Sequence, residues 1–310
     1  MTDKVNTLPS DNASTTPVVS VAIIAYQHES YIEQAVLSVL DQKTNFSLEI
    51  LVADDCSTDR TPEILRFLDQ RFPGRLTFLV DDRNLGLSAN IQRCRQFARG
   101  KYFAILEGDD YWIDPMKLQR QHDAMQANPT WSMCFGFWKV IYESGNRSPV
   151  VKPASAPVGP LTVDDFLEEN PIQTMSVAMY RQGLVCETPP WHEAIRIGDW
   201  ALHIMHTQFG PVGFVPEVLT AYRVHDRGLW SGLGTFARWQ ELLYLFESLE
   251  SHFEGDIAAK MKRAKEKVLG DCAARVADLE KVERRYRGLG LERLSGIYRK
   301  LRDRFVPRGQ

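Results

Sequence analysis

Short apolar runs alternate with helix-forming stretches between residues 18 and 106, and this alternation restricts the fold more than any other feature. Strands are predicted over residues 18–25, 48–53, 76–80 and 102–106, with helices after Ser30, over 61–72 and over 88–98. Strands separated by helices at this spacing form a parallel sheet with helices on both faces. The sequence therefore predicts an α/β fold with a doubly wound, mostly parallel sheet.

Three local signals set the expected helix boundaries. Ser30 with Glu33 three residues later predicts a capping box at the first helix. Thr61-Pro62 places proline at the first helical position, where its missing N–H does no harm. Gly100 is expected to end the third helix.

Polar side chains follow all four predicted strands. They are Tyr26, Gln27, His28 and Glu29 after the first, Asp54 and Asp55 after the second, Asp82, Arg83 and Asn84 after the third, and Glu107, Asp109 and Asp110 after the fourth. Ligands of such sheets bind outside the carboxyl ends of the strands. Carboxylates for a cation, an arginine for phosphate and an aromatic ring for a base favour a nucleotide diphosphate. A dinucleotide site is excluded because no G-x-G-x-x-G follows the first strand, and no Walker P-loop is present.

Asp109 and Asp110 leave the apolar run 102–106 together. Adjacent carboxylates repel each other, whereas a hard divalent cation that also binds substrate phosphates compensates both charges. The alternative is a solvated turn or a helix N-cap, since Asp114-Pro115 just downstream is itself a plausible helix start.

Composition excludes several classes of protein. A chain of 310 residues, 44% hydrophobic and 25% charged, can bury a sizeable core, and a net charge of −3 argues against a dedicated nucleic-acid binder. Five cysteines without C-x-x-C spacing indicate neither a disulfide framework nor a zinc site. With no apolar run of membrane-span length and no export signal, we expect a cytoplasmic protein.

Several ordered motifs resemble family 2 glycosyltransferases, which have the GT-A fold. They are 19–29 (VSVAIIAYQHE), 31–42 (YIEQAVLSVLDQ), 52–59 (VADDCSTD), 84–90 (NLGLSAN), 106–112 (LEGDDYW), 198–200 (GDW) and 222–231 (YRVHDRGLWS). The resemblance covers roughly residues 18–235 and is closest to bacterial enzymes that assemble cell-surface polysaccharide. It departs from the family at residues 24–27, where proline, a hydroxyl residue and asparagine are usual, and at Glu107, where aspartate is more common.

The resemblance implies roles for individual residues. Nucleotide binding is implied for Tyr26, Glu29, Asp54, Asp55, Arg83, Asn84, Glu107 and Asp109. Asp109 is expected near ribose and metal, and Asp110 as a direct ligand of Mn²⁺ or Mg²⁺. His225 is expected to complete the metal site, since imidazole suits manganese beside carboxylates. Taken alone, such a histidine is more often a structural hydrogen-bonding residue.

Asp199 is the expected catalytic base. The resemblance places the family's base at this position, and sugar transfer to a hydroxyl needs a base aimed at the acceptor. A single displacement of this kind inverts the anomeric centre. The alternative is an N-cap carboxylate, because Asp199 precedes a predicted helix over 201–209 that Gly210 ends.

Three tryptophans are candidates for the acceptor side of the site. Trp230, flanked by glycines, is expected to act as a lid over the donor. Trp112 and Trp200, like Trp191, either stack on sugar faces or belong to the core, and the sequence leaves both readings open.

The chain divides into a disordered lead-in (1–17), a GT-A domain (18–234) and a basic helical region (235–310). Residues 260–310 hold 16 Lys or Arg against 7 Asp or Glu, a formal charge of +9. One reading is a solvated helical pair that packs on the domain or on a second copy of the chain. The other is that these helices bind anionic lipid at the inner face of the cell membrane, with an attraction of about 1 kcal/mol per basic residue. A lipid contact suits a lipid-linked acceptor.

The predicted function is that of an inverting, metal-dependent glycosyltransferase. It is expected to transfer a sugar from a nucleotide-sugar donor, with a UDP-sugar favoured, to a glycan or lipid-linked acceptor. Two alternatives stay open. A sugar-nucleotide pyrophosphorylase usually carries a Gly-rich basic loop after the first strand, where this chain has Ala25-Tyr26-Gln27-His28. A catalytically silent binding module would keep the fold without turnover, and retention of Asp109, Asp110, Asp199 and His225 argues against it.

Overall fold

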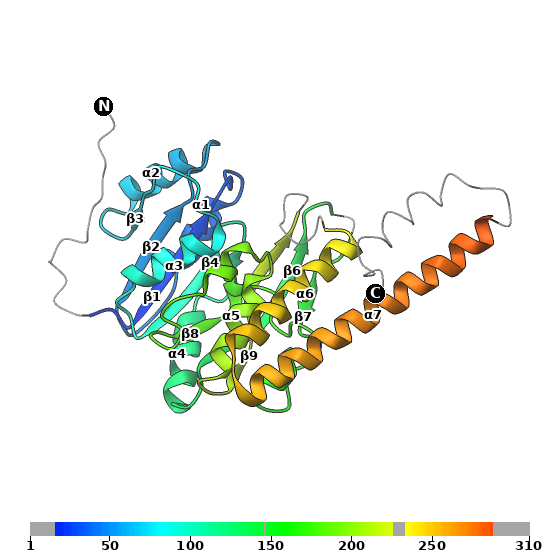
Figure 1. Ribbon diagram of the computed structural model, residues 1–310. Coiled ribbons are helices and arrows are strands. Elements are labelled where there is room, and N and C mark those ends of the chain that lie inside the picture. Colours follow the sequence, from blue (N-terminus) through cyan, green and yellow to red (C-terminus); the bar gives the residue numbers. More distant parts are fainter. Residues whose placement is uncertain (1–15, 146, 226–232, 288–310) are drawn as a thin grey trace. The chain divides into compact units, whose positions relative to one another are not determined.

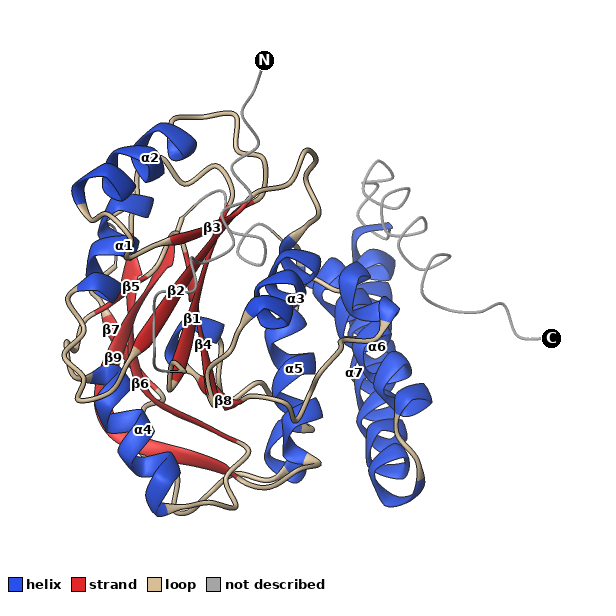
Figure 2. Ribbon diagram, turned by 90° about the vertical axis from the view of Figure 1, so that its left-hand side faces the viewer, coloured by secondary structure: helices blue, strands red, loops and turns tan. Residues whose placement is uncertain are grey.

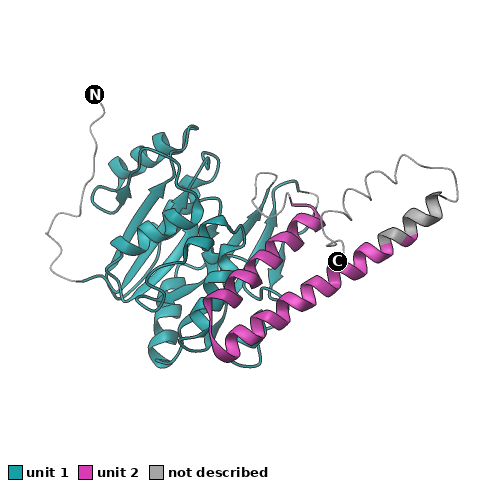
Figure 3. Ribbon diagram, in the orientation of Figure 1, with its two compact units in different colours: residues 1–232 teal, residues 233–310 magenta. Residues whose placement is uncertain are grey.

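The structure is a computed structural model that describes residues 16–145, 147–225 and 233–287 (Figure 1). The chain separates into two compact units, residues 1–232 and 233–310, and each is described by itself (Figure 3).

The described part of the first unit is built on a nine-stranded sheet in the order β3-β2-β1-β4-β8-β6-β9-β5, with β7 paired to β6. The strands are β1 (Val19–Ala25), β2 (Leu48–Asp54), β3 (Thr77–Leu79), β4 (Tyr102–Glu107), β5 (Tyr111–Trp112), β6 (Met133–Tyr142), β7 (Val150–Lys152), β8 (Met179–Arg181) and β9 (Val212–Val224). The first four are parallel, β6 and β9 are parallel, and β5, β7 and β8 pair antiparallel. The predicted mostly parallel α/β sheet is confirmed.

Helices cover both faces of this sheet. They are α1 (Ile32–Leu40), α2 (Thr61–Arg71), α3 (Leu87–Phe97), α4 (Lys117–Ala127) and α5 (Gly198–Thr207), with short 3₁₀ turns η1 (Val163–Phe166), η2 (Met175–Val177) and η3 (Pro190–Ala194). Figure 2 shows α1, α2 and α4 on one side of the sheet and α3 and α5 on the other. Every residue of β1 is buried, as are Tyr102 through Leu106 of β4, which explains why these segments read as continuous apolar runs.

Two predicted helix signals behave differently in the structure. The capping box is wrong: α1 begins at Ile32, and the carbonyl of His28, not the Ser30 side chain, accepts the first free N–H groups, those of Tyr31 and Ile32. The third helix already ends at Phe97. Gly100 instead allows the backbone to pass close to β1, because a Cβ at this position would lie 2.5 Å from the Ser20 nitrogen.

A lysine is buried in the core beneath the metal-type motif. Lys117 is fully buried, its Nζ lies 2.7 Å from Gln121 Oε1, and it stands 4.2 Å from the centre of the Trp112 ring. Burial lowers the pKa of Lys117 to about 7. Because the amine gives up its charge easily here, it can be accommodated among apolar side chains.

The second unit begins with two helices, α6 (Thr235–His252) and α7 (Gly255–Arg287), which pack on each other. Gly255, with φ +59°, makes the turn between them. Leu245, Phe246 and Leu249 of α6 are buried, as is Met261 of α7. The helical prediction for this region is confirmed over residues 235–252 and 255–287. Over the described residues, the helices are too short or too polar to cross a bilayer.

Candidate functional site

The loops that follow β1, β2 and β4 lie at one edge of the sheet. Strand register places Ala25 beside Asp54 and Ile24 beside Glu107, so the three strands end together. The β3 loop joins them, because Asn84 Nδ2 donates to the Asp55 carbonyl at 3.0 Å. All four groups of polar residues singled out in the sequence therefore share this edge.

The β1–α1 loop is held in an unusual backbone conformation. Gln27 has φ +58°, a region that non-glycine residues rarely adopt. Its backbone N–H donates to Ser57 Oγ at 2.8 Å, and its side-chain oxygen accepts the N–H groups of Thr58 and Asp59. This bonding leaves the ring of Tyr26 47% exposed at the edge. The Glu29 carboxylate binds the Arg60 N–H at 3.0 Å.

Two acidic residues after β2 have different surroundings. Both oxygens of buried Asp55 accept backbone bonds, from Leu85 at 2.7 Å and Gly86 at 2.8 Å. Asp55 thereby shapes the loop that carries exposed Arg83 and Asn84. Asp54 is half-buried and accepts the Ser57 hydroxyl at 2.5 Å.

Asp109 is the carboxylate of the β4 loop that faces imidazoles. Its Oδ2 lies 3.0 Å from His225 Nε2 and 3.8 Å from His28 Nε2. Burial alone would raise the pKa of Asp109, but the His225 hydrogen bond and the two imidazoles hold it below its usual range. The same bond raises the pKa of His225.

Asp110 points into the protein instead. Its Oδ1 accepts the Arg223 N–H at 2.9 Å, and its Oδ2 lies 3.2 Å from the Thr174 hydroxyl. Burial, with the neighbouring Asp109 charge, raises the pKa of Asp110 to about 8. Glu107 shares the Thr174 hydroxyl at 3.3 Å, and burial raises its pKa too. Donors inside the protein thus bond both oxygens of Asp110. The role of Asp110 as a direct metal ligand stays a prediction.

The residues present fit a cation that the protein only partly encloses. Over the described residues, no three His, Cys, Asp or Glu side chains gather as a protein-only metal centre requires. Asp109 and His225 can supply two ligands, with phosphate and water oxygens for the remainder, which is how Mg²⁺ usually binds beside phosphates. Imidazole also suits Mn²⁺.

Asp199 lies in the first turn of α5, not at its N-cap. The helix begins at Gly198 without a side-chain capping bond. The Asp199 carboxylate instead accepts Asn170 Nδ2 at 2.8 Å. Burial raises the pKa of Asp199 to about 6, against the lowering effect of that bond. An ionisable carboxylate of this kind can accept a proton near neutral pH.

Two predicted sugar-stacking tryptophans belong to the core. Trp112 is 4% exposed and donates Nε1–H to the Ser176 carbonyl, and Trp200 is 7% exposed and donates to the Phe166 carbonyl. Both side chains are almost fully buried, which favours the core reading of the two that the sequence left open. Trp230 lies outside the described residues, and Trp191 is half-buried.

The sequence reasoning missed Arg223, which holds the β4 loop in place. Its guanidinium donates to the Asp109 carbonyl at 2.5 Å and to Gln34 Oε1, and it lies between the rings of Tyr31 and Tyr111 at 5.1 and 4.9 Å. The available signal was the position of Arg223 itself, two residues before His225 in the Tyr222-Arg223-Val224-His225 motif.

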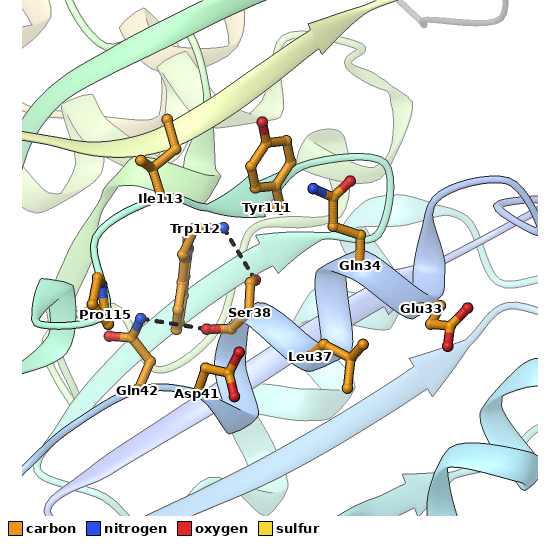
Figure 4. Close-up of a pocket in the computed structure, with 10 residues that line it drawn as sticks. All are labelled: Glu33, Gln34, Leu37, Ser38, Asp41, Gln42, Tyr111, Trp112, Ile113 and Pro115. Carbon is orange, nitrogen blue, oxygen red and sulfur yellow. Dashed lines mark hydrogen bonds between the residues drawn. The ribbon is translucent and has the colours of Figure 1, made fainter.

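A groove of about 530 Å³ lies between α1 and β5 (Figure 4). Much of its polar lining is already bonded internally: Ser38 Oγ accepts the Trp112 N–H at 3.1 Å, and Gln42 Nε2 donates to the Ser38 and Asp114 carbonyls. Among the predicted site residues that the structure describes, Trp112, an acceptor-side candidate, is the one that lines this groove.

A family model described as "Glycosyl transferase family 2" matches residues 20–187. The uncharacterized protein Rv1520 of Mycobacterium tuberculosis is 37% identical over 219 residues, which are 71% of this chain and 62% of that protein. WfgD of Escherichia coli, a UDP-Glc:alpha-D-GlcNAc-diphosphoundecaprenol beta-1,3-glucosyltransferase, is 30% identical over 53% of this chain and 60% of its own length. The match thus spans less than two thirds of each of these relatives.

Solved structures with the same fold carry nucleotide sugars. S. aureus TarS in complex with UDP-GlcNAc has a TM-score of 0.58 at 16% identity, over 81% of this chain and 71% of that chain. A mannosyltransferase from Pyrobaculum calidifontis with GDP-Man and Mn²⁺ has a TM-score of 0.56 at 18% identity, over 93% of this chain and 84% of that chain. At these identities the likeness shows the fold, which is GT-A as predicted.

The Arg223 contacts predict a stability difference between two arginines. Arg223→Met removes two hydrogen bonds of a charged group, so we expect the free energy of unfolding to fall by about 2–4 kcal/mol in urea titration. Arg120→Met is the matched control. Its pairs with Asp114 and Glu217 involve a side chain that is 44% exposed, so it should change stability by no more than about 1 kcal/mol. Equal effects of the two changes would contradict the role given to Arg223.

Proposed function

This chain belongs to glycosyltransferase family 2, and on that premise we propose that it moves a sugar from a nucleotide-diphosphate donor to a hydroxyl of a glycan or lipid-linked acceptor, with inversion. The observation that carries the proposal is the grouping of Asp109 and His225 at the sheet edge where β1, β2 and β4 end. Family membership counts against the pyrophosphorylase alternative.

The donor is proposed to be a UDP-sugar. Support comes from the UDP-Glc in the name of WfgD and the UDP-GlcNAc bound to TarS. The exposed ring of Tyr26 and half-buried Asp54 are proposed to contact the base, and exposed Arg83 and Asn84 are proposed to contact the nucleotide from the β3 side. Asp55 acts through the loop it holds, and Glu29 through its bond to Arg60. Glu107 lies behind Asp109 on the same loop.

Asp109 and His225 are proposed to hold Mn²⁺ or Mg²⁺ against the donor diphosphate. The cation, when bound, stabilises the charge that develops on the leaving diphosphate. Asp110 and Arg223 keep the loop in place behind it, through the Asp110 bond to the Arg223 N–H and the Arg223 bond to the Asp109 carbonyl. Asp109 is therefore supported by a residue of another strand, β9.

Asp199 is proposed to accept the proton of the acceptor hydroxyl. Asn170 holds one of its carboxylate oxygens, which orients the other. The hydroxyl oxygen then forms the new bond to the anomeric carbon as the bond to the diphosphate breaks. Because attack and departure occur on opposite faces, the anomeric configuration inverts. The acceptor is proposed to be lipid-linked, by analogy with the diphosphoundecaprenol acceptor in the name of WfgD.

A panel of UDP- and GDP-sugars tests the proposal as a whole. Release of the free nucleoside diphosphate should occur with at least one UDP-sugar and should increase on addition of Mn²⁺. Absence of turnover, together with absence of UDP binding in Mn²⁺, would contradict it.

The base assignment predicts a pH dependence. Asp199 must be ionised to accept a proton, and burial raises its pKa to about 6. The rate of sugar transfer from the UDP-sugar that the panel selects should therefore increase as the pH rises through about 6. Asp199→Asn should lower the rate by about 10²–10⁴ with UDP affinity unchanged. Asp69→Asn, on α2, is the control and should leave both unchanged. An undiminished rate in Asp199→Asn would return this residue to a structural role.

The metal assignment predicts a change in nucleotide affinity. Calorimetry should show that UDP binds the wild-type chain more tightly in Mn²⁺ than in EDTA. Asp109→Asn should remove most of that gain, because the variant loses the anionic ligand. Asp110→Asn should also remove most of the gain in UDP affinity if Asp110 is a direct ligand. It should reduce the gain less than Asp109→Asn does if Asp110 only supports the loop. Identical UDP binding in EDTA and Mn²⁺ by the wild type would count against a metal.

The basic C-terminal region is proposed to contact anionic lipid. Co-sedimentation with phosphatidylglycerol vesicles should weaken sharply from 0.01 M to 1 M salt, because the Debye length falls from about 30 Å to about 3 Å. Replacement of Arg284, Arg285 and Arg287 by Glu should weaken co-sedimentation at low salt. The control Lys101→Gln, in the first unit, should leave it unchanged. Binding that ignores both salt and charge reversal would leave only packing of helices as the explanation.

A further inference from the structure

His28 occupies a fixed position at the sheet edge, although no role was assigned to it. Its backbone N–H donates to Thr61 Oγ1 at 2.9 Å, and its carbonyl accepts the first N–H groups of α1. The residue before it, Gln27, has a positive φ and makes four hydrogen bonds to the β2 loop. Strained backbone that its surroundings hold in place is typical of functional sites.

The imidazole of His28 lies against the backbone of the β4 loop. A Cβ at Gly108 would stand 2.7 Å from His28 Nδ1, so a larger residue at position 108 would displace the ring. Gly108 does not have a positive φ, and the space it leaves is needed by His28 and by the Ile24 carbonyl. The glycine between Glu107 and Asp109 is therefore explained by the histidine that lies over it.

Two imidazoles approach the same oxygen of Asp109 from different parts of the chain. His225, at the end of β9, lies 3.0 Å from Oδ2, and His28, after β1, lies 3.8 Å from it. Tyr31 packs beside both, with ring centres 6.4 Å from His28 and 5.3 Å from His225. The His28 side chain is 18% exposed and that of Asp109 is 23% exposed, so both reach the surface at this edge.

We infer that His28 is a positioning residue for the metal-binding carboxylate: its Nε2–H holds Asp109 Oδ2 toward the cation when His225 turns from that carboxylate to the metal. The inference rests on the proposed function. In the described structure His225 bonds Asp109 directly, and a cation bound by both would replace that bond. His28 Nε2, which lies 3.8 Å from Oδ2 in the described structure, then remains beside it. A partner of this kind fixes the orientation of a ligand, and its loss typically weakens metal affinity about 10–100-fold.

The test compares two replacements of His28 in the full-length chain. Mn²⁺ is titrated in the presence of UDP, with free Mn²⁺ followed by electron paramagnetic resonance. His28→Leu fills the space without a donor and should raise the Kd for Mn²⁺ about 10–100-fold. His28→Gln keeps an N–H donor and should recover part of that loss. UDP affinity in EDTA and the urea midpoint should be close to wild type in both variants, which separates positioning from misfolding.

His122→Leu is the matched control. His122 is likewise a histidine beside a carboxylate, with its Nδ1 3.0 Å from Asp123 Oδ1, but it lies on α4, so this change should leave the Kd for Mn²⁺ unchanged. An unchanged Kd in His28→Leu, with wild-type metal binding intact, overturns the inference and leaves the proposed function standing. A wild-type chain that binds no Mn²⁺ with UDP overturns both the metal assignment and the inference.

Discussion

The site depends on placing three carboxylates within four residues at the end of a buried strand. Glu107, Asp109 and Asp110 cannot all be ionised at close range without compensation. Each carboxylate has different neighbours in the structure. Asp110 and Glu107 share the Thr174 hydroxyl inside the protein, whereas Asp109 faces His225 and His28. One carboxylate thereby remains charged and outward, which is the condition for binding a cation.

The partners that make this separation come from distant parts of the chain. Arg223, on β9, binds Asp110 through its backbone and the Asp109 carbonyl through its side chain. Tyr31 and Tyr111 enclose its guanidinium from α1 and β5. The parallel β6–β9 pair, which is outside the β1–β4 core, brings Arg223 and His225 to the same edge. A family model that covers residues 20–187 therefore includes the carboxylates but not the strand that supports them.

The proposed base and the proposed metal ligands belong to separate elements. Asp199 belongs to α5, on the face of the sheet opposite α1, whereas Asp109 and His225 terminate strands (Figure 2). Asn170 Nδ2 donates to the Asp199 carboxylate at 2.8 Å. The Asp199 charge is nevertheless one of the causes, after burial and the charges of Asp110 and Asp109, that raise the pKa of Glu107 in the β4 loop.

The sequence by itself determined the α/β alternation, the shared edge of the strand-end loops and the residues Asp109, Asp199 and His225 as candidates, because these depend on local periodicity and on motifs. Tertiary structure decided which carboxylate faces outward, that Trp112 and Trp200 are core residues, and that Arg223 and His28 serve the same loop. The decisive partners lie far apart in sequence, such as His225 and Asp109 at a separation of 116 residues. Burial and hydrogen-bond partners at such separations arise only when the strands pack, and no local pattern encodes them.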